Sequence, residues 1–246
     1  MADGMRLNKF MAQSGLCSRR EADKYIEAGQ VYINGQIASV GQTVRDSDKV
    51  TIGAKQLKKR DRIVVLAWYK PTGITCTEKD PHAKRKIADV FKYPIRVTYA
   101  GRLDQDSEGL LLMTNDGDLI QGLMKGANRH EKEYIVKVDK EIDSDFIAKM
   151  QKGVYLKELD VTTRTCEILQ EGKYTFRIIL TQGLNRQIRR MSEACGRKVV
   201  SLKRVRVENI LLGALQPGAY REIEGKELKD LYDIVNRNKG VSRGNE

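Results

Sequence analysis

Three acidic side chains at alternate positions, Asp104, Asp106 and Glu108, are the residues of this sequence best suited to chemistry. They lie in a polar loop that precedes the apolar run at residues 110–113. A carboxylate in such a loop can act as a nucleophile, as a general acid or base, or as a metal ligand. The residues around the loop discriminate among these roles.

Several interpretations fit part of the acidic pattern. Asp104-x-Asp106-x-Glu108 imitates the start of an EF-hand calcium loop, but the twelfth loop position is Asn115, where calcium needs a bidentate Glu. A pair of glycosidase carboxylates stays open, because the separation of two carboxylates cannot be derived from a loop sequence. Where one acid does the chemistry, the others can cap a turn or stay solvated. We expect this of Asp106 and Glu108.

The composition narrows the class of partner. The 246 residues carry a formal net charge of +12, which favours a polyanion because each neutralised phosphate releases a condensed counterion. The sequence has no apolar run near about 20 residues and no signal-peptide or lipidation pattern, so no membrane partner is expected. Four well-separated cysteines without a Cys-x-x-Cys pair, with only two histidines, predict reduced thiols in the cytoplasm and no metal site.

Residues 63–236 must position the acidic loop, and their pattern predicts an α+β domain. Strand-like segments outnumber helix-like ones and lack a regular βαβ rhythm, which favours a mixed or antiparallel sheet with flanking helices. We expect strands at 63–68, 110–113, 134–138, 175–180 and 199–207, and helices at 119–125, 144–152, 185–194 and 226–235. Residues 53–62 are predicted to form a basic linker before this domain, and 237–246 a polar, flexible tail.

Residues 5–52 form a separate pattern, in which two helices precede short strands. Apolar residues at helical spacing predict a first helix from about Leu7. A capping-box pattern that begins at Ser18 marks the start of the second helix. The dipeptide Asn34-Gly35 predicts a two-residue β-hairpin turn. Two helices followed by short strands predict that residues 5–52 form a separate compact domain.

Basic side chains gather on the two helices of this module. A solvated charged face would explain them, but a basic two-helix module on a basic chain favours contact with RNA. The pattern Arg-Leu-Asn-Lys, Cys-Ser-Arg-Arg-Glu-Ala and Val-x-Ile-Asn-Gly resembles the S4-type RNA-binding domain and covers almost the whole module. We therefore expect RNA contacts from Arg6, Lys9, Arg19 and Arg20.

The acidic loop resembles the catalytic motif of the pseudouridine synthases of the small-subunit rRNA type, the RsuA-like family. The motif is Gly-Arg-Leu-Asp-x-x-(Ser/Thr)-x-Gly-Leu-Leu-x-x-Thr-Asn-x-Gly, and every fixed position is present from Gly101 to Gly117. Two further blocks, at residues 130–134 and 182–191, resemble the Lys-x-Tyr block and the third block of the family, in the same order. They are most similar to the branch of the large-subunit (23S rRNA) synthase F.

The resemblance implies roles for individual residues. Asp104 is implied to be the nucleophile that holds the sugar or the base while the ring turns, with the target base flipped out of its stack. Tyr134 is implied to stack on that base, and Arg189 to keep Asp104 charged. The implied RNA contacts are Arg102, Leu103, Gln105, Arg186, Gln187, Ile188 and Arg190, although some members of the branch carry Lys where this chain has Gln105.

Several of these roles depend on the resemblance. On composition alone, Tyr134 is a core tyrosine and Arg102 the partner of a structural salt bridge. The helix at 185–194 carries Arg186, Arg189 and Arg190 on one face, which an ordinary amphipathic surface helix also explains.

The resemblance implies an RNA pseudouridine synthase, an isomerase without a cofactor, that acts as a monomer in the cytoplasm on a uridine of structured 23S rRNA. A stem-loop of 16S rRNA or of tRNA stays open as the substrate. Two other classes also stay open, namely a catalytically silent RNA-binding ribosome-assembly factor and a nucleosidase that acts on small molecules. The presence of Asp104, Tyr134 and Arg189 argues against a silent factor.

Overall fold

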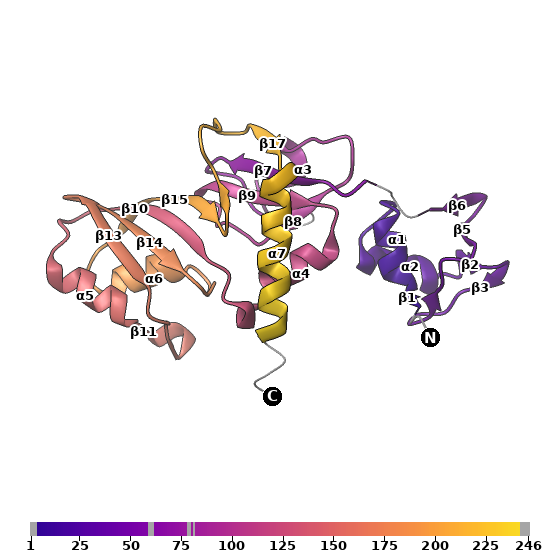
Figure 1. Ribbon diagram of the computed structural model, residues 1–246, viewed down its shortest axis with the longest axis horizontal. Coiled ribbons are helices and arrows are strands. Elements are labelled where there is room, and N and C mark those ends of the chain that lie inside the picture. Colours follow the sequence, from indigo (N-terminus) through magenta and orange to yellow (C-terminus); the bar gives the residue numbers. More distant parts are fainter. Residues whose placement is uncertain (1–3, 59–61, 78–79, 81, 242–246) are drawn as a thin grey trace. The chain divides into compact units, whose positions relative to one another are not determined.

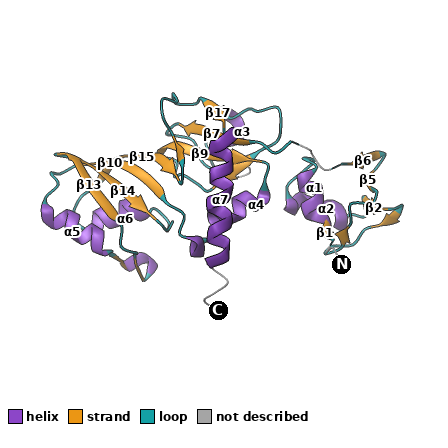
Figure 2. Ribbon diagram, viewed as in Figure 1, coloured by secondary structure: helices purple, strands orange, loops and turns teal. Residues whose placement is uncertain are grey.

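The computed structural model describes residues 4–58, 62–77, 80 and 82–241, and the chain divides into two compact units (Figure 1). The first unit comprises Met1–Val64 with the short segments Pro94–Val97 and Asn115–Gly117. The second comprises Val65–Tyr93, Thr98–Thr114 and Asp118–Glu246. Helices and strands occur in both units, so the predicted α+β class is confirmed (Figure 2).

The N-terminal unit begins with two helices, α1 (Leu7–Gln13) and α2 (Arg19–Glu27). The Ser18 hydroxyl accepts a 3.3 Å hydrogen bond from the Glu21 amide, and the Glu21 carboxylate accepts a 2.8 Å bond from the Ser18 amide. The predicted capping box is therefore confirmed. The chain leaves α2 through Gly29 at φ +67°, a conformation that favours glycine.

Short strands complete the N-terminal unit. A four-stranded antiparallel sheet has the order β3-β2-β5-β6, and β1 pairs with β4. Asn34 and Gly35, at φ 51° and 83°, form the predicted two-residue turn between β2 and β3. The strands are β1 (Met5–Arg6), β2 (Val31–Ile33), β3 (Gln36–Ile37), β4 (Thr43–Val44), β5 (Val50–Ile52) and β6 (Lys55–Leu57).

The linker predicted at 53–62 is partly wrong, because residues Lys55–Leu57 form strand β6. It pairs with β5, and Leu57 is buried in the core of the N-terminal unit together with Val31 and Val50. A three-residue strand with a single apolar side chain has too short an alternation to be detected among charged residues. Residues 59–61 of the predicted linker lie outside the described part of the chain.

The second unit is built around a mixed sheet, nine-stranded within the described residues. Its order is β13-β14-β10-β15-β9-β7-β17, with β16 paired to β15 and β8 paired to β9. The pairing of β15 with β9 is parallel and the other pairings are antiparallel. The strands are β7 (Val65–Lys70), β8 (Thr98–Ala100), β9 (Glu108–Thr114), β10 (Lys132–Val138), β13 (Glu167–Gly172), β14 (Thr175–Leu180), β15 (Val199–Val207), β16 (Ile210–Leu211) and β17 (Tyr220–Glu222).

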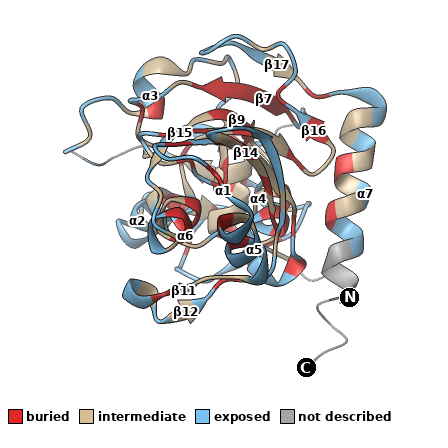
Figure 3. Ribbon diagram, turned by 90° about the vertical axis from the view of Figure 1, so that its left-hand side faces the viewer, coloured by how far each residue is buried: buried red, intermediate tan, exposed pale blue. Residues whose placement is uncertain are grey.

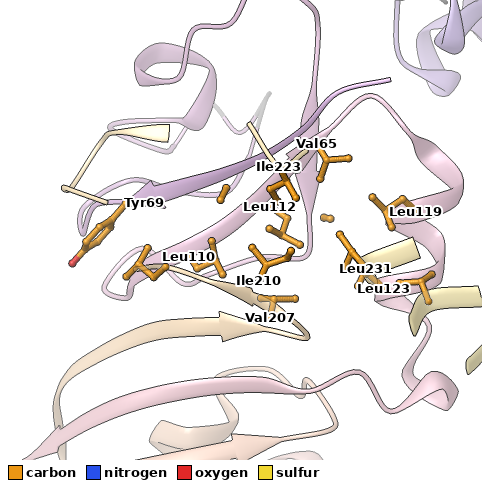
Figure 4. Packing of buried hydrophobic residues seen from close by; sticks show 14 residues of the cluster. Val65, Tyr69, Leu110, Leu112, Leu119, Leu123, Val207, Ile210, Ile223 and Leu231 are labelled. Atoms are coloured by element: carbon orange, nitrogen blue, oxygen red, sulfur yellow. The ribbon is translucent and has the colours of Figure 1, made fainter. Parts of the chain in front are cut away.

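Helices cover the sheet in two places. The β7–β9 part packs against α4 (Gly117–Met124) and α7 (Gly225–Val241), where Leu112, Leu119 and Leu231 share one core (Figure 4). The β10–β14 part packs against α5 (Ser144–Lys152) and α6 (Gln187–Ala194) through a second core (Figure 1). Strand β7 is buried along its whole length (Figure 3). The smaller elements are α3 (Ile87–Val90), β11 (Tyr155–Leu156), β12 (Val161–Thr162) and the 3-10 turns η1 (Gly126–Asn128) and η2 (Lys157–Leu159).

The predicted segments agree with these elements to different degrees. Those at 144–152, 175–180 and 199–207 have the bounds of α5, β14 and β15. Helix α6 begins at Gln187 rather than at residue 185, because Arg186 has a left-handed backbone at φ 50°. Helix α7 continues to Val241, which corrects the tail predicted from residue 237, and residues 242–246 lie outside the described part. No helix within the described residues is long and apolar enough to cross a membrane.

Candidate active site

The loop that carries Asp104 connects β8 to β9 and is bounded by two glycines. Gly101 has φ +91°, and Gly109 has φ +104°. A Cβ at Gly109 would lie 2.2 Å from the backbone carbonyl oxygen of Arg204. Strands β9 and β15 meet here, at the start of their parallel pairing. Gly109 is therefore required for the close approach of the acidic loop to β15.

Lys70, at the end of β7, fixes the backbone of this loop. Its side chain is fully buried, and its Nζ donates to the carbonyl oxygens of Pro71 at 3.0 Å, Asp104 at 3.1 Å and Ser107 at 2.7 Å. Burial lowers the pKa of the ammonium, and the negative charges of Asp104 and Asp106 oppose this shift. Lys70 was not among the residues predicted for the site. Its signal is a lysine that ends a buried apolar strand directly before a proline.

The Asp104 carboxylate is accessible, with 34% of the side chain exposed. The Ser107 amide donates a 3.1 Å hydrogen bond to the Asp104 carbonyl oxygen, which closes a turn and leaves the carboxylate outside it. An ion pair reaches this carboxylate from Arg186, whose Nη1 lies 3.8 Å from Oδ2. Arg189 was expected to be the cation paired with Asp104, but the ion pair within 4 Å of this carboxylate comes from Arg186.

Asp106 is the acid that the two arginines bind most closely. Arg186 donates from Nη1 to Oδ1 at 3.2 Å and from Nη2 to Oδ2 at 2.9 Å, and Arg189 Nε lies 3.3 Å from Oδ2. Burial raises the pKa of the Asp106 carboxyl, but the Arg186 hydrogen bond and the charges of both arginines outweigh it and lower the pKa. Asp106 is solvent-exposed, as predicted, with 47% of its side chain accessible, but it is also paired with two arginines, which the sequence did not predict.

Arg189 binds the backbone and a hydroxyl of the acidic loop. Its Nη2 donates to the carbonyl oxygen of Asp106 at 3.0 Å and to Ser107 Oγ at 3.4 Å, and its Nη1 donates to the Val199 carbonyl oxygen at 3.3 Å. Burial lowers the pKa of the guanidinium, and the charges of Asp106 and Asp104 favour its protonated form. Arg189 thus connects α6, β15 and the acidic loop, and its positive charge interacts with the carboxylates of both Asp104 and Asp106.

Glu108 also has a defined partner, which corrects the prediction that it is solvated. Its Oε2 accepts a 2.9 Å hydrogen bond from the Tyr69 hydroxyl. Burial and this carboxylate raise the pKa of Tyr69 to about 12. Lys203 Nζ lies 5.0 Å from the centroid of the same ring. Among the described residues, Asp106 and Glu108 each accept a side-chain hydrogen bond of 2.9 Å, whereas the Asp104 carboxylate has its ion-pair partner, Arg186, at 3.8 Å.

Tyr134 lies on a row of residues that crosses three neighbouring strands. It is opposite Arg204 of β15, and Arg204 is opposite Gly109 of β9, where the acidic loop ends. The half-buried Tyr134 side chain packs against the core cluster that contains Ile188 of α6. Tyr134 and α6 therefore lie on the same face of the sheet.

Arg204, within this row, and Lys132, two residues before Tyr134, are basic side chains. Arg204 is 2% exposed, and its Nε donates to the Leu110 carbonyl oxygen at 2.7 Å. Lys132 Nζ donates to the His130 carbonyl oxygen at 3.2 Å. Burial and the charge of Arg204 lower the pKa of Lys132 to about 8. The interior beside Tyr134 is therefore rich in positive charge.

The residues expected to contact RNA divide into buried and exposed side chains. Leu103 and Ile188 are buried, and the buried Gln187 accepts a 3.1 Å hydrogen bond from the Leu184 amide. These three side chains are not available to RNA in this structure, because Ile188 packs in the core beneath α6 and Leu103 and Gln187 are buried as well. This is a correction to the predicted contact set.

The other predicted contacts are open to solvent or partly so. Arg102 and Gln105 are exposed in the acidic loop. Arg190 is half-buried, forms an ion pair with Glu158 and donates from Nε to the Asn185 carbonyl oxygen at 3.1 Å. Arg102 and Gln105 are therefore the exposed predicted contacts in the loop of Asp104, and the Gln105 amide also donates to the Gly73 carbonyl oxygen at 3.4 Å.

In the N-terminal unit, the predicted basic contacts lie at the beginnings of the two helices. Arg19 and Arg20 are exposed in the first turn of α2. Arg6 precedes α1 and donates from Nη1 to the Gly41 carbonyl oxygen at 2.7 Å, and Lys9 lies half-buried on α1. Within the described residues, no group of His, Cys, Asp or Glu side chains is placed to hold a metal ion.

An accessible carboxylate, held in a fixed loop beside two arginines, can form a covalent bond to a substrate and be released again. The sequence model of the RNA pseudouridylate synthase family matches residues 64–194, and that of the S4 domain matches residues 5–50. The chain belongs to the RNA pseudouridylate synthase family and is therefore a pseudouridine synthase, an isomerase, with an N-terminal S4 domain.

Individual relatives agree with this assignment. The chain is 42% identical over 233 residues to the dual-specificity RNA pseudouridine synthase RluF of Escherichia coli, which covers 94% of this chain and 79% of the relative. It is 34% identical to the ribosomal large subunit pseudouridine synthase B of Bacillus subtilis, over 96% of this chain and 99% of the relative. A crystal structure of a pseudouridylate synthase superposes with a TM-score of 0.67 at 26% identity, over 94% and 99% of the two chains. The family and the similarity to the synthase F branch are thus confirmed.

Proposed function

We propose that this pseudouridine synthase converts a specific uridine of structured 23S rRNA to pseudouridine, with Asp104 as the nucleophile. The observation that carries the proposal is the accessible Asp104 carboxylate, in a loop whose backbone Lys70 fixes and whose flank Arg186 occupies. The choice of rRNA is supported by the relatives, one of which is named for the large ribosomal subunit.

The isomerisation exchanges one bond for another. The bond between C1′ and N1 breaks and one between C1′ and C5 forms, while C5 loses a proton and N1 gains one, so the reaction needs no oxidant and no group carrier. An Asp104 oxygen forms a transient bond to the nucleotide, at C1′ or on the base. A bond to C1′ breaks as C5 displaces the oxygen there, and a bond to the base breaks by elimination after C5 has bonded to C1′. Arg186, 3.8 Å away, offers the carboxylate an opposite charge.

The target base must leave its stack before its C1′ can be reached. We assign Tyr134 to stacking on the flipped base, since its ring lies on the α6 face of the sheet in the row that ends at the acidic loop. Arg102 and Gln105, both exposed in that loop, are assigned to the flanking phosphates.

The N-terminal unit is assigned to holding the folded RNA through Arg6, Lys9, Arg19 and Arg20. Their positive charges suit phosphate contacts that do not depend on sequence. We further propose that the chain acts as a monomer in the cytoplasm. Light scattering after size exclusion tests the monomer, and a mass of two chains at working concentration would contradict it.

Mapping of pseudouridine in total RNA tests the proposed substrate. Cells that lack the protein are compared with the same cells expressing the wild-type chain or Asp104→Asn. We expect one uridine of 23S rRNA to become pseudouridine with the wild-type chain only. Modification confined to 16S rRNA or tRNA would refute the choice of 23S rRNA, and identical maps in all three strains would refute the activity on cellular RNA.

A further inference from the structure

Arg186 lies between two carboxylates and binds them unequally. It makes two hydrogen bonds to Asp106, at 3.2 Å and 2.9 Å, while its nearest atom lies 3.8 Å from Asp104 Oδ2. A two-pronged pair of this kind is the strongest arrangement that an arginine makes with a carboxylate. The guanidinium can form it with one of the two acids at a time, so Asp104 and Asp106 compete for Arg186.

We propose that Asp106 is a positioning residue that holds Arg186 away from Asp104, so that an oxygen of the nucleophile stays open to the substrate. The inference rests on the proposed function, since it presumes that Asp104 is the nucleophile. If Arg186 instead formed its two-pronged pair with Asp104, both oxygens of that carboxylate would accept hydrogen bonds. The nucleotide would then have to displace the arginine before a bond could form.

The backbone at Arg186 supports this role. Its φ of 50° and ψ of 34° are left-handed, a conformation that is uncommon for a residue other than glycine and persists only where the surroundings impose it. Helix α6 begins at the next residue, so the left-handed backbone of Arg186 sets the direction of its side chain at the start of the helix. It directs the side chain to Asp106.

Arg189 fixes the position of Asp106. Arg189 Nη2 donates to the Asp106 carbonyl oxygen at 3.0 Å, and Arg189 Nε lies 3.3 Å from Asp106 Oδ2. Both arginines lower the pKa of the Asp106 carboxyl, which therefore stays charged at neutral pH and keeps its hold on Arg186. Arg189 thus holds Asp106 in place, and Asp106 in turn holds Arg186.

Asp106→Asn tests the inference because the amide keeps the size of the side chain and removes its charge. The measurement is the single-turnover rate of pseudouridine formation on a 23S rRNA fragment, with enzyme in saturating excess. Since a small misplacement at a reacting atom costs up to about 100-fold, we expect the rate to fall by about 10- to 100-fold. The melting temperature should not change, because 47% of the Asp106 side chain is exposed and such ion pairs add little to stability.

A matched control is Asp145→Asn, which removes an acid from an exposed ion pair with Lys149 on α5. It should leave both the rate and the melting temperature unchanged. A wild-type rate in Asp106→Asn would overturn the inference. The wild-type chain in the same assay separates the two proposals, because absence of pseudouridine there refutes the proposed function rather than the role of Asp106.

A second variant distinguishes positioning from a merely structural role. Asp106→Asn with Arg186→Gln removes the guanidinium that lies 3.8 Å from Asp104, while Arg189 stays bound to the loop backbone. We expect the single-turnover rate of the double variant to exceed that of Asp106→Asn. Saturating enzyme removes the effect of any phosphate contact that Arg186 makes. A double variant as slow as Asp106→Asn, or slower, would overturn the inference.

Discussion

The ammonium of Lys70 donates a 2.7 Å hydrogen bond to the carbonyl oxygen of Ser107, three residues beyond Asp104. The same ammonium binds the Asp104 carbonyl oxygen at 3.1 Å. The buried ammonium of Lys70, on strand β7, thus fixes the backbone of the loop that carries Asp104. Lys70 thus fixes the backbone position of Asp104, and Asp106 and Arg186 form the charged surroundings of its carboxylate.

Lys70→Met should destabilise the second unit. Methionine fills a similar volume but leaves buried carbonyl oxygens without a donor, at about 1–3 kcal/mol for each such group. We expect the free energy of unfolding in denaturant to fall by about 3 kcal/mol. The control is Lys137→Met, an exposed lysine of β10, which should stay within about 0.5 kcal/mol of the wild type. Equal stabilities of the two variants would contradict the role of Lys70.

Gly109→Ala should separate β9 from β15. The new Cβ would lie 2.2 Å from the Arg204 carbonyl oxygen at a φ of +104°, so both the contact and the backbone become unfavourable. Strain of this kind alone costs about 1–3 kcal/mol, and we expect a loss of at least about 2 kcal/mol in the free energy of unfolding. Gly117→Ala is the control, because its Cβ meets no atom within 4 Å. Loss of stability in the control but not in Gly109→Ala would refute the close approach.

The stability of the chain should depend on pH through Lys132. Burial and Arg204 lower the pKa of Lys132 from 10.5 to about 8 in the folded chain. Between these values the unfolded chain binds more protons than the folded one, so the free energy of unfolding rises with pH, by up to about 3 kcal/mol. This contribution is complete above the unfolded pKa and is lost as the pH falls through about 8.

Lys132→Met isolates that contribution from other titrating groups. Denaturant unfolding of both chains, at about pH 7 and about pH 10, gives the difference between variant and wild type at each pH. The variant should be the more stable chain at the lower pH, and its advantage should shrink at the higher pH. A difference that does not change with pH would show that Lys132 titrates normally.

Much of the fold was predictable from local patterns. The capping box at Ser18 and the Asn34-Gly35 turn depend on a few neighbouring residues and were confirmed. Segments with clear apolar periodicity, such as β14 and α5, had the correct bounds. Strand β6 was missed because it is held by its partner strand rather than by its own alternation.

The site was less predictable, because its decisive contacts join distant segments. The motif located Asp104, but the partner of each acid depends on side-chain directions that spacing alone does not give. Arg186 and Arg189 both lie on the predicted face of α6, yet Arg186 is the one that forms the ion pair with Asp104. Lys70 lies 34 residues before Asp104 and reaches it only in the folded sheet.

Basic residues of the N-terminal unit should control the salt dependence of RNA binding. Arg19→Ser with Arg20→Ser removes two exposed charges at the start of α2 and leaves the Ser18 capping box intact. If each arginine binds a phosphate, the slope of log affinity against log salt should decrease by about 2. Filter binding of a 23S rRNA fragment at several salt concentrations measures it. An unchanged slope would remove these two residues from the RNA-binding surface.

The central claim is that Asp104 performs the chemistry. Its most direct test is the single-turnover formation of pseudouridine by Asp104→Asn on a 23S rRNA fragment that carries the unmodified target uridine. The affinity of the variant for this RNA is first shown to equal that of the wild type. Asparagine keeps the size of the side chain but cannot act as a carboxylate nucleophile. The account predicts bound RNA without pseudouridine. Pseudouridine formed by Asp104→Asn at a rate near that of the wild type would contradict it.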